Sequence, residues 1–308
     1  MKRTLLLILC ISFALFSQAQ KLTKTISNEK TEQHVNIPGT QVFLVIPDGY
    51  KLDEIGTSVR KGMIGSLQVE SEPGVDYTLR SVLFTEKHLA QNGLKKINVK
   101  KINVGNYPAK YAVYENASGL SKCMDIIFGD HSFTTKITTS YSAGNKSEEQ
   151  TLISMLESIY FDPDHTIDPL SNAPFTIDTS RSVYKEISLV GMSIKCDNPG
   201  NDYASLYLSL ATRAAWDQKS SFLDIYPNTY IRDGGSFIVS KEKEDKIGGY
   251  DFFLKEYITT TEAGEEALIY CGIITNGKRH LIFTSFIEEN REENIEEIDK
   301  LLGGVAFR

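Results

Sequence analysis

The chain has 308 residues, 41% of them hydrophobic and 24% charged, which is the composition of a globular protein and excludes an intrinsically disordered one. Its formal net charge of −7 argues against nucleic acids and anionic lipids as partners, because their phosphates would be repelled. The acidic residues are concentrated in the second half of the chain. Residues 21–161 carry 16 basic and 15 acidic side chains, whereas residues 162–308 carry 15 basic and 25 acidic side chains.

The N-terminus has the pattern of a secretory signal peptide. Two basic residues precede an apolar run over residues 5–16, which is shorter than the roughly 20 residues that a membrane-spanning helix needs. Ser17 and Ala19 provide small residues at the two positions that signal peptidase recognises, so we expect cleavage before residue 20. The sequence therefore predicts a signal peptide over residues 1–19, export to the periplasm or the cell exterior, and a mature chain without a transmembrane segment.

The first half of the mature chain has an α+β pattern after a polar, flexible lead-in over residues 20–36. Apolar alternation, or a short apolar run between Pro and Gly turns, predicts strands. These strands are expected over residues 40–47, 63–70, 97–104, 109–115, 123–128 and 133–141. Helical spacing predicts a helix over residues 77–92 and a second helix that begins at Ser147, an expected N-cap, and ends near Ile159.

A linker is predicted over residues 162–175, which contain three prolines and no hydrophobic period. Beyond it, residues 206–216 have helix-like spacing, and residues 288–302 predict a closing helix with acids in its first turns, where the helix dipole favours them. Asn276-Gly277 is typical of a two-residue hairpin turn. Strands are expected over residues 188–196, 221–226, 236–242, 268–274 and 280–286.

The two halves end in the same series of elements, a Gly-x-Tyr corner, a hairpin, a strand and an acidic helix. The corner is Gly105-Asn106-Tyr107 in the first half and Gly248-Gly249-Tyr250 in the second. A repeat of this length predicts a tandem duplication, and therefore two domains that each bury a core of their own.

Three short motifs in the first half resemble the PsbP-like superfamily, which includes the DcrB-like envelope proteins. They are Pro47-Asp48-Gly49-Tyr50, Gly105-Asn106-Tyr107-Pro108-Ala109 and Ser158-Ile159-Tyr160-Phe161. The second half departs from them, since Asp251 replaces the proline of the corner. The resemblance implies an α+β fold of two tandem α/β/α sandwich domains, each with a mainly antiparallel sheet and flanking helices, over residues 37–161 and, as a diverged copy, residues 176–308. It also implies binding or assembly, with no catalytic residue to carry over.

Aromatic residues follow both corners and are the first candidates for a binding site. Alternate positions of a strand lie on one face, so we expect part of each set to be exposed, where tyrosine favours recognition. The alternative is that these side chains pack in the core and against the sheet faces. The selected candidates are Tyr107, Tyr111, Tyr250 and Tyr257.

The expected linker contains a candidate metal site. Asp162, Asp164, His165 and Asp168 place three carboxylates and an imidazole within seven residues. Oxygen-rich clusters of this kind bind calcium or manganese, although the glycine and the final glutamate of an EF-hand loop are missing. The alternative is a solvated acidic linker, and no other cofactor is predicted.

Three cysteines remain after removal of the signal peptide. Cys196 and Cys271 share the second half and are the pair that an oxidising compartment would join in a disulfide, which leaves Cys123 unpaired. Three buried free thiols are the alternative.

No catalytic motif is present, since the sequence lacks Gly-x-Ser-x-Gly, His-Glu-x-x-His and Gly-x-Gly-x-x-Gly. We therefore predict an exported, non-enzymatic binding or assembly protein of the bacterial envelope, whose partner is an envelope protein or a small ligand. Two alternatives remain open. One is a secreted hydrolase that uses His131 or His280 with nearby acids, and the other is an envelope scaffold whose acidic second half binds calcium.

Overall fold

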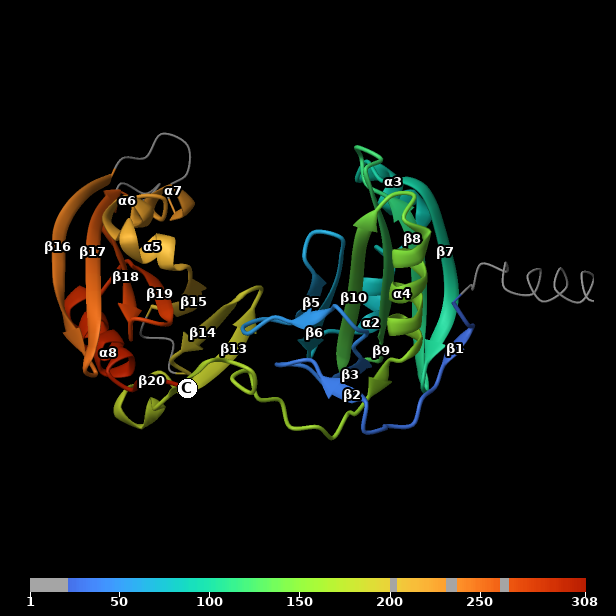
Figure 1. The fold of residues 1–308 in the computed structure, drawn as a ribbon, viewed down its shortest axis with the longest axis horizontal. Helices are drawn as coiled ribbons and strands as arrows, with labels where there is room; N and C mark the ends of the chain where they lie inside the picture. Colours follow the sequence, from blue (N-terminus) through green and yellow to red (C-terminus); the bar gives the residue numbers. More distant parts are fainter. Residues whose placement is uncertain (1–21, 200–203, 231–236, 261–265) are drawn as a thin grey trace, which may run out of the picture. The chain divides into compact units, whose positions relative to one another are not determined.

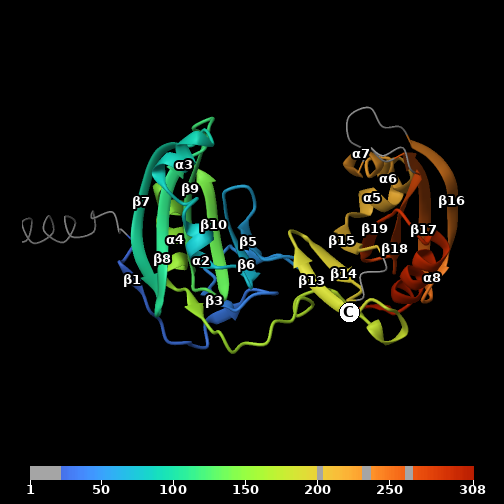
Figure 2. The same ribbon diagram turned by 180° about the vertical axis from the view of Figure 1, so that it is seen from behind.

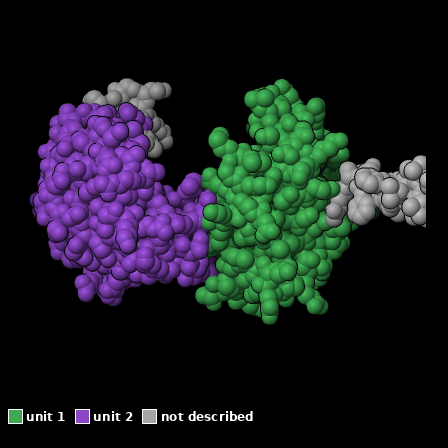
Figure 3. Space-filling view, viewed as in Figure 1, with its two compact units in different colours: residues 1–52, 58–166 green, residues 53–57, 167–308 purple. Residues whose placement is uncertain are grey.

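The computed structural model of the chain describes residues 22–199, 204–230, 237–260 and 266–308 (Figure 1, and Figure 2 from behind). The expected signal peptide lies outside the described residues. The chain forms two compact units: unit 1 comprises residues 1–52 and 58–166, and unit 2 comprises residues 53–57 and 167–308 (Figure 3). Within the described ranges no helix is both long and apolar enough to span a membrane.

Unit 1 is built on an 8-stranded sheet in the order β1-β7-β8-β9-β10-β6-β5-β4. Neighbouring strands pair antiparallel, except that β1 pairs parallel with β7. The strands are β1 (Thr25–Ile26), β4 (Lys51–Leu52), β5 (Ser58–Lys61), β6 (Gly65–Pro73), β7 (Lys95–Val104), β8 (Tyr107–Glu115), β9 (Ser121–Gly129) and β10 (Phe133–Ser142). A small sheet in the order β11-β3-β2 is formed by β2 (His34–Asn36), β3 (Val42–Val45) and β11 (Tyr160–Phe161).

Helices cover both faces of the unit 1 sheet, because the strands present apolar side chains on both. On one face, α4 (Lys146–Glu157) packs Leu152 and Leu156 into a core that also contains Tyr111. On the opposite face, α2 (Tyr77–Ser81) and α3 (Glu86–Gln91) cover a second core that contains Ala112 and Tyr114 (Figure 2). We call the face under these two helices the short-helix face of unit 1.

Unit 2 is built on a 7-stranded antiparallel sheet in the order β13-β14-β15-β19-β18-β17-β16. Its strands are β13 (Glu186–Val190), β14 (Ser193–Asp197), β15 (Leu206–Ala211), β16 (Phe237–Ile247), β17 (Tyr250–Thr260), β18 (Glu266–Thr275) and β19 (His280–Ile287). A two-stranded sheet joins β12 (Phe175–Ile177) to β20 (Val305–Phe307), and a 3-10 turn, η1, spans Thr179–Arg181.

The helices of unit 2 are also divided between the two faces of its sheet. α8 (Arg291–Leu302) packs Ile298 and Leu301 on one face. The other face is covered by α5 (Arg213–Asp217) and α6 (Lys219–Leu223), which contribute Trp216 and Leu223 and are followed by α7 (Pro227–Tyr230). We call this second face the short-helix face of unit 2.

The two sheets have the same strand order. In unit 1 the order β4-β5-β6-β10-β9-β8-β7 corresponds, strand by strand, to β13-β14-β15-β19-β18-β17-β16 in unit 2, and β1 is an additional strand of unit 1. The long helix that follows the last strand of the sheet, α4 or α8, packs on the same face in each unit. The expected α+β class, with two tandem sandwich domains, is confirmed.

Several local predictions are wrong. Part of the lead-in is ordered, because Ile26 of β1 is buried in the unit 1 core. The expected helix over residues 206–216 is β15 followed by α5, and the expected strand over residues 221–226 overlaps α6. Short apolar runs fit a buried strand and a buried helix equally well, so their period does not separate the two. The helix over residues 77–92 is divided into α2 and α3, and α4 is capped by Asn145, which accepts a hydrogen bond from the Glu148 amide at 3.2 Å.

Candidate functional site

The short-helix face holds a tyrosine–aspartate hydrogen bond in both units. Tyr107 and Tyr250 are the first residues of β8 and β17, and Tyr114 and Tyr257 each lie seven positions further along these corresponding strands. Tyr114 donates its hydroxyl to Asp125 Oδ2 at 2.9 Å in unit 1. Tyr257 donates to Asp224 Oδ1 at 2.7 Å in unit 2. The surroundings of these two aspartates differ, and the difference defines the candidate site.

In unit 1 the short-helix face contains a cavity of about 360 Å³, which we call the Asp125 groove. Strands β6, β8, β9 and β10 form its floor, and the segment from α2 to the residues after α3 forms its wall. Its apolar lining consists of Leu83, Phe84, Leu89, Leu94 and Ile127. The charged and polar lining consists of Glu70, Glu72, Arg80, Tyr114, Asp125, Thr134 and Lys136.

Asp125 is a buried carboxylate whose hydrogen bonding is incomplete. The residue is 1% exposed and lies on the middle of β9, opposite Ala112 of β8. Its Oδ2 accepts the Tyr114 hydrogen bond and lies 3.9 Å from the Lys136 ammonium. Its Oδ1 is fully buried and has no hydrogen-bond partner among the described residues. Buried polar atoms are almost always paired, so an orphan acceptor on a residue that lines a cavity makes the groove a candidate site.

Burial raises the pKa of the Asp125 carboxyl from 3.8 to about 6. The Lys136 ammonium and the Tyr114 hydroxyl act in the opposite direction because they stabilise the charged form, and the negative charge of Glu70 adds to the increase. A weaker side-chain hydrogen-bond contact from Thr138, the cross-strand neighbour on β10, also lowers the pKa. A strongly shifted carboxyl that faces a cavity is a frequent property of binding and catalytic sites.

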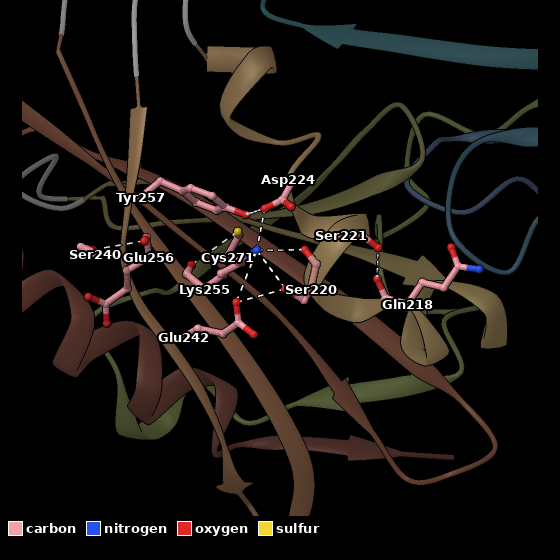
Figure 4. A network of polar contacts seen from close by, with 10 residues as sticks. All are labelled: Gln218, Ser220, Ser221, Asp224, Ser240, Glu242, Lys255, Glu256, Tyr257 and Cys271. Carbon is pink, nitrogen blue, oxygen red and sulfur yellow. Dashed lines mark hydrogen bonds and ion pairs between the residues drawn. The ribbon is translucent and has the colours of Figure 1, made fainter.

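In unit 2 the corresponding face carries a buried lysine whose hydrogen bonds are satisfied (Figure 4). Lys255 of β17 is 3% exposed. Its ammonium contacts Asp224 Oδ1 at 2.6 Å, Ser220 Oγ at 3.0 Å and the Ser220 carbonyl at 3.1 Å, with Glu242 Oε2 at 3.4 Å. Partial burial raises the pKa of Asp224, but the hydrogen bonds from Lys255 and Tyr257 outweigh this effect and lower it below its usual value. The network therefore fixes α6 on the sheet.

One pair of cross-strand positions accounts for the contrast between the units. Ala112 pairs with Asp125 between β8 and β9. Counted from the first residue of β17, the position of Ala112 is taken by Lys255, and Lys255 pairs with Cys271. Unit 1 therefore buries an anion with a free acceptor, and unit 2 buries a cation whose partners come from its own chain.

The four tyrosines selected from the sequence are not exposed on the strand faces. Tyr111 and Tyr257 are buried core residues with exposed fractions of 6% and 0%. Tyr107 and Tyr250 are half-buried and pack against the cores of unit 1 and unit 2. Exposure was expected from alternation, but helices cover both faces of each sheet, and alternate positions are therefore buried on either side. Tyr107 does line a smaller cavity of about 250 Å³ in unit 1, and Tyr257 belongs to the Lys255 network.

The structure does not assemble the candidate metal site. Asp162 accepts a hydrogen bond from the Asp164 amide at 3.2 Å, and Asp168 accepts one from the Leu170 amide at 2.9 Å. His165 packs edge-on against Phe43 at a ring distance of 4.9 Å. In the described part of the chain no group of three His, Cys, Asp or Glu side chains converges as metal ligands would. The acidic side chains are used in local turns.

The expected disulfide between Cys196 and Cys271 is not formed, and the described cysteines are free. Cys196 belongs to the core under α8, whereas Cys271 belongs to the core on the short-helix face, so the two thiols point to opposite sides of one sheet. Burial raises the pKa of each of these two thiols to about 12. Cys123 is only partly buried, so two of the three thiols are buried.

Asp125 and Lys255 are not among the candidate residues selected from the sequence. A signal for Asp125 was present, because it is a charged residue inside the apolar strand segment Met124-Asp125-Ile126, whereas Lys255 is followed by a second charged residue, Glu256, and had no such signal. A charged residue in a strand that is apolar on both faces must find a partner or a function. The partner depends on strand pairing, which a single sequence does not show.

No protein-family model matches the chain, and no curated protein matches it. Parts of it are similar to solved structures. A Bacteroides thetaiotaomicron protein is 14% identical over 44% of this chain with a TM-score of 0.32, and the chain spans only 45% of that protein. A cyanobacterial PsbP from Synechocystis sp. PCC 6803 is 10% identical over 49% of this chain and 86% of its own, with a TM-score of 0.30. The immunity protein TplEi of the type VI secretion system from Pseudomonas aeruginosa is 8% identical over 89% of this chain and 97% of its own, with a TM-score of 0.38.

The PsbP similarity covers about half of the chain, and two tandem PsbP copies remain an expectation from the sequence. Similarities at this level do not assign a function.

Proposed function

We propose that this chain is a binding protein and that the Asp125 groove of unit 1 holds its ligand. The observation that carries the proposal is Asp125, a buried carboxylate that lines a 360 Å³ cavity and whose Oδ1 has no hydrogen-bond partner among the described residues. A mainly apolar pocket with one or a few convergent polar groups is typical of a small-molecule site or of a pocket that receives a partner's side chain. A ligand donor would complete the hydrogen bonding that the chain leaves incomplete.

Binding is favoured over catalysis by the groups that accompany Asp125. Neither the Asp125 groove nor the cavity beside Tyr107 is lined by a histidine. His131 is exposed in the turn between β9 and β10, and His280 is buried against the Trp216 ring at 6.1 Å. The hydrolase alternative needs a histidine, a carboxylate and a hydroxyl within hydrogen-bond reach of one another in one pocket, and these cavities do not offer that arrangement.

The rim of the groove supports recognition of an apolar ligand. Leu83 lines the groove and is 47% exposed, and its neighbours on the same segment, Leu79 and Val82, are 71% and 62% exposed. Solvent-exposed apolar side chains next to a pocket favour a ligand or partner that covers them. The sequence also predicts a signal peptide, so the proposed binding protein is an exported one. Mass spectrometry of the secreted form would test whether its first residue is Gln20, as expected.

Methyl NMR with a small neutral probe tests the groove directly. Titration of the mature chain with hexan-1-ol is expected to shift the methyl signals of Leu89, Leu94 and Ile127, which line the cavity. Leu83→Trp at the rim is expected to remove these shifts, whereas Leu120→Trp, at a 75% exposed position outside the groove, is the matched control and should leave them unchanged. If the shifts are absent in the wild type, or persist equally in both variants, the groove is not the site.

A further inference from the structure

We propose that the Asp125 groove selects a primary ammonium group carried on an apolar chain, as in an alkylamine or in the lysine side chain of a partner. This inference rests on the proposed function, because it names the chemistry of the ligand of the same groove. Four observations support it: the charge of the lining, the geometry of its acceptor, the apolar wall, and the lysine that unit 2 places on the corresponding face.

The charged lining has an excess of one negative charge, with Glu70, Glu72 and Asp125 against Arg80 and Lys136. Arg80 is committed to Glu72 through hydrogen bonds of 2.7 and 2.5 Å. Lys136 is the remaining cation; its ammonium lies 3.9 Å from Asp125 Oδ2, and Glu70 is its cross-strand neighbour on β6. One carboxylate therefore lacks a cation of its own, and a cationic ligand would restore the balance.

The acceptor geometry favours a strong donor. Asp125 Oδ2 is occupied by Tyr114, while Oδ1 accepts no hydrogen bond from the described residues. An ammonium group that reaches the Asp125 carboxylate can donate to it with charge assistance, which makes the bond roughly twice as strong as one from a neutral hydroxyl. A carboxylate ligand would meet the charge of Asp125 and be repelled. The body of the ligand would lie against Leu89, Leu94 and Ile127, which requires an apolar chain.

Unit 2 shows that this face of the fold accommodates an ammonium. The strand position that Ala112 occupies in unit 1 is occupied by Lys255 in unit 2, and Asp224 holds that ammonium at 2.6 Å. In unit 2 the cation belongs to the chain itself. In unit 1 the small, buried Ala112 stands at that position, and Asp125 lies directly opposite on β9 and lines the groove. Unit 1 therefore has a carboxylate on this face without the lysine that unit 2 supplies from its own chain.

A titration of the mature chain with three probes of equal length tests the inference. Hexylamine is expected to bind at least about tenfold more tightly than hexan-1-ol near neutral pH, and hexanoate should bind more weakly than either. Asp125→Asn should reduce the affinity for hexylamine to that for hexan-1-ol. Ala112→Lys should supply the ammonium from within the chain and abolish amine binding. Ala112→Met, of similar length but uncharged, is the control, and it should still bind the amine more tightly than the alcohol.

Two peptides separate the sources of the ammonium. A short peptide with one lysine between leucines is compared with the same peptide acetylated on that lysine. If only the unmodified peptide binds, and more tightly than hexylamine, the source is a partner protein; if hexylamine binds more tightly than the peptide, the source is a free amine.

The outcomes separate this inference from the proposed function. Equal affinity for hexylamine and hexan-1-ol in the wild type, or undiminished amine binding by Asp125→Asn, overturns the ammonium inference and leaves the groove as a binding site for neutral apolar ligands. If none of the three probes shifts the groove methyl signals, the proposed function itself is overturned. Circular dichroism of every variant checks that it is folded before its affinity is compared.

Discussion

Replacing Asp125 by asparagine is expected to stabilise unit 1 near neutral pH, although it removes the carboxylate on which the proposed site depends. Burial raises the pKa of this carboxyl from 3.8 to about 6, against the opposing effects of Lys136 and Tyr114. In the unfolded chain the group titrates near its ordinary value, so the folded state holds the proton more tightly. Ionisation therefore lowers the folding stability of the wild type as the pH rises: the cost is absent below the unfolded pKa of 3.8 and complete above the folded pKa of about 6.

The magnitude follows from the separation of the two pKa values. A separation of about 2 units at about 1.4 kcal/mol per unit corresponds to about 3 kcal/mol. Asparagine does not ionise and keeps an acceptor for Tyr114, but its amide leaves N–H donors unpaired in the groove, at a cost of about 1 kcal/mol. We therefore expect Asp125→Asn to gain about 2 kcal/mol at about pH 7.5 and to lose up to about 1 kcal/mol at about pH 4, where the ionisation cost of the wild type is small and the cost of the amide remains. A gain in stability on removal of a polar group is typical of a position that is kept for function.

The single tryptophan provides an internal control for this measurement. Trp216 lies in unit 2, so its fluorescence follows the unfolding of that unit, whereas far-UV circular dichroism follows both units. In urea at about pH 7.5, the unfolding of unit 1 is the circular dichroism transition that Trp216 fluorescence does not report. Asp125→Asn should shift this transition to a higher urea concentration and leave the Trp216 transition unchanged. Asp130→Asn is the matched control, because hydrogen bonds from Ser132 lower the pKa of this exposed carboxyl and no gain is expected. A loss of stability in Asp125→Asn at neutral pH, or an equal gain at both pH values, would refute the reasoning.

The remaining predictions concern unit 2 and the cysteines. Lys255→Met should destabilise unit 2 by about 2 kcal/mol, read from the Trp216 transition, because it removes charge-assisted hydrogen bonds from a buried network. Lys241→Met is the control, because Lys241 is an exposed lysine in an ion pair with Glu256, and its loss should change the stability by less than about 1 kcal/mol. A similar loss of stability in both variants would contradict the structural role of Lys255. Tyr257→Phe should cost about 1 kcal/mol through the loss of one hydrogen bond, in the same fluorescence assay. In the native mature protein a thiol reagent should modify Cys123 first, and the two buried cysteines should react only in denaturant; modification of all three at one rate would show that the cores are open.

Local pattern was sufficient for the elements that carry strong turn and period signals. The hairpin at Asn276-Gly277 connects β18 and β19, and the closing helices α4 and α8 lie where apolar spacing predicted them. The main division of the chain falls between residues 166 and 167, but residues 53–57, expected in the first domain, are grouped with unit 2. These features depend on neighbouring residues, and neighbours are what a sequence shows directly.

Local pattern was not sufficient to predict which faces of the sheets are buried. Alternation along β8 separates Tyr111 from Ala112 and Tyr114, but it does not say whether the second face is exposed or covered. The tertiary structure covers it with α2 and α3, and Tyr257 of unit 2 is buried in the same way. The tyrosines selected as an exposed surface are therefore packing residues, because an α/β/α sandwich buries both faces of its sheet.

The sequence by itself determined an α+β chain of two tandem domains with a repeated order of elements. Only the tertiary structure decided that Asp125 stands opposite Ala112 at the floor of a cavity, and that Lys255 stands opposite Cys271 among acceptors of its own chain. The physical reason is the range of the interactions. Turns, caps and periods are set by residues a few positions apart, whereas the charge balance of a buried site depends on strands that pair across the sheet and on helices that pack over it.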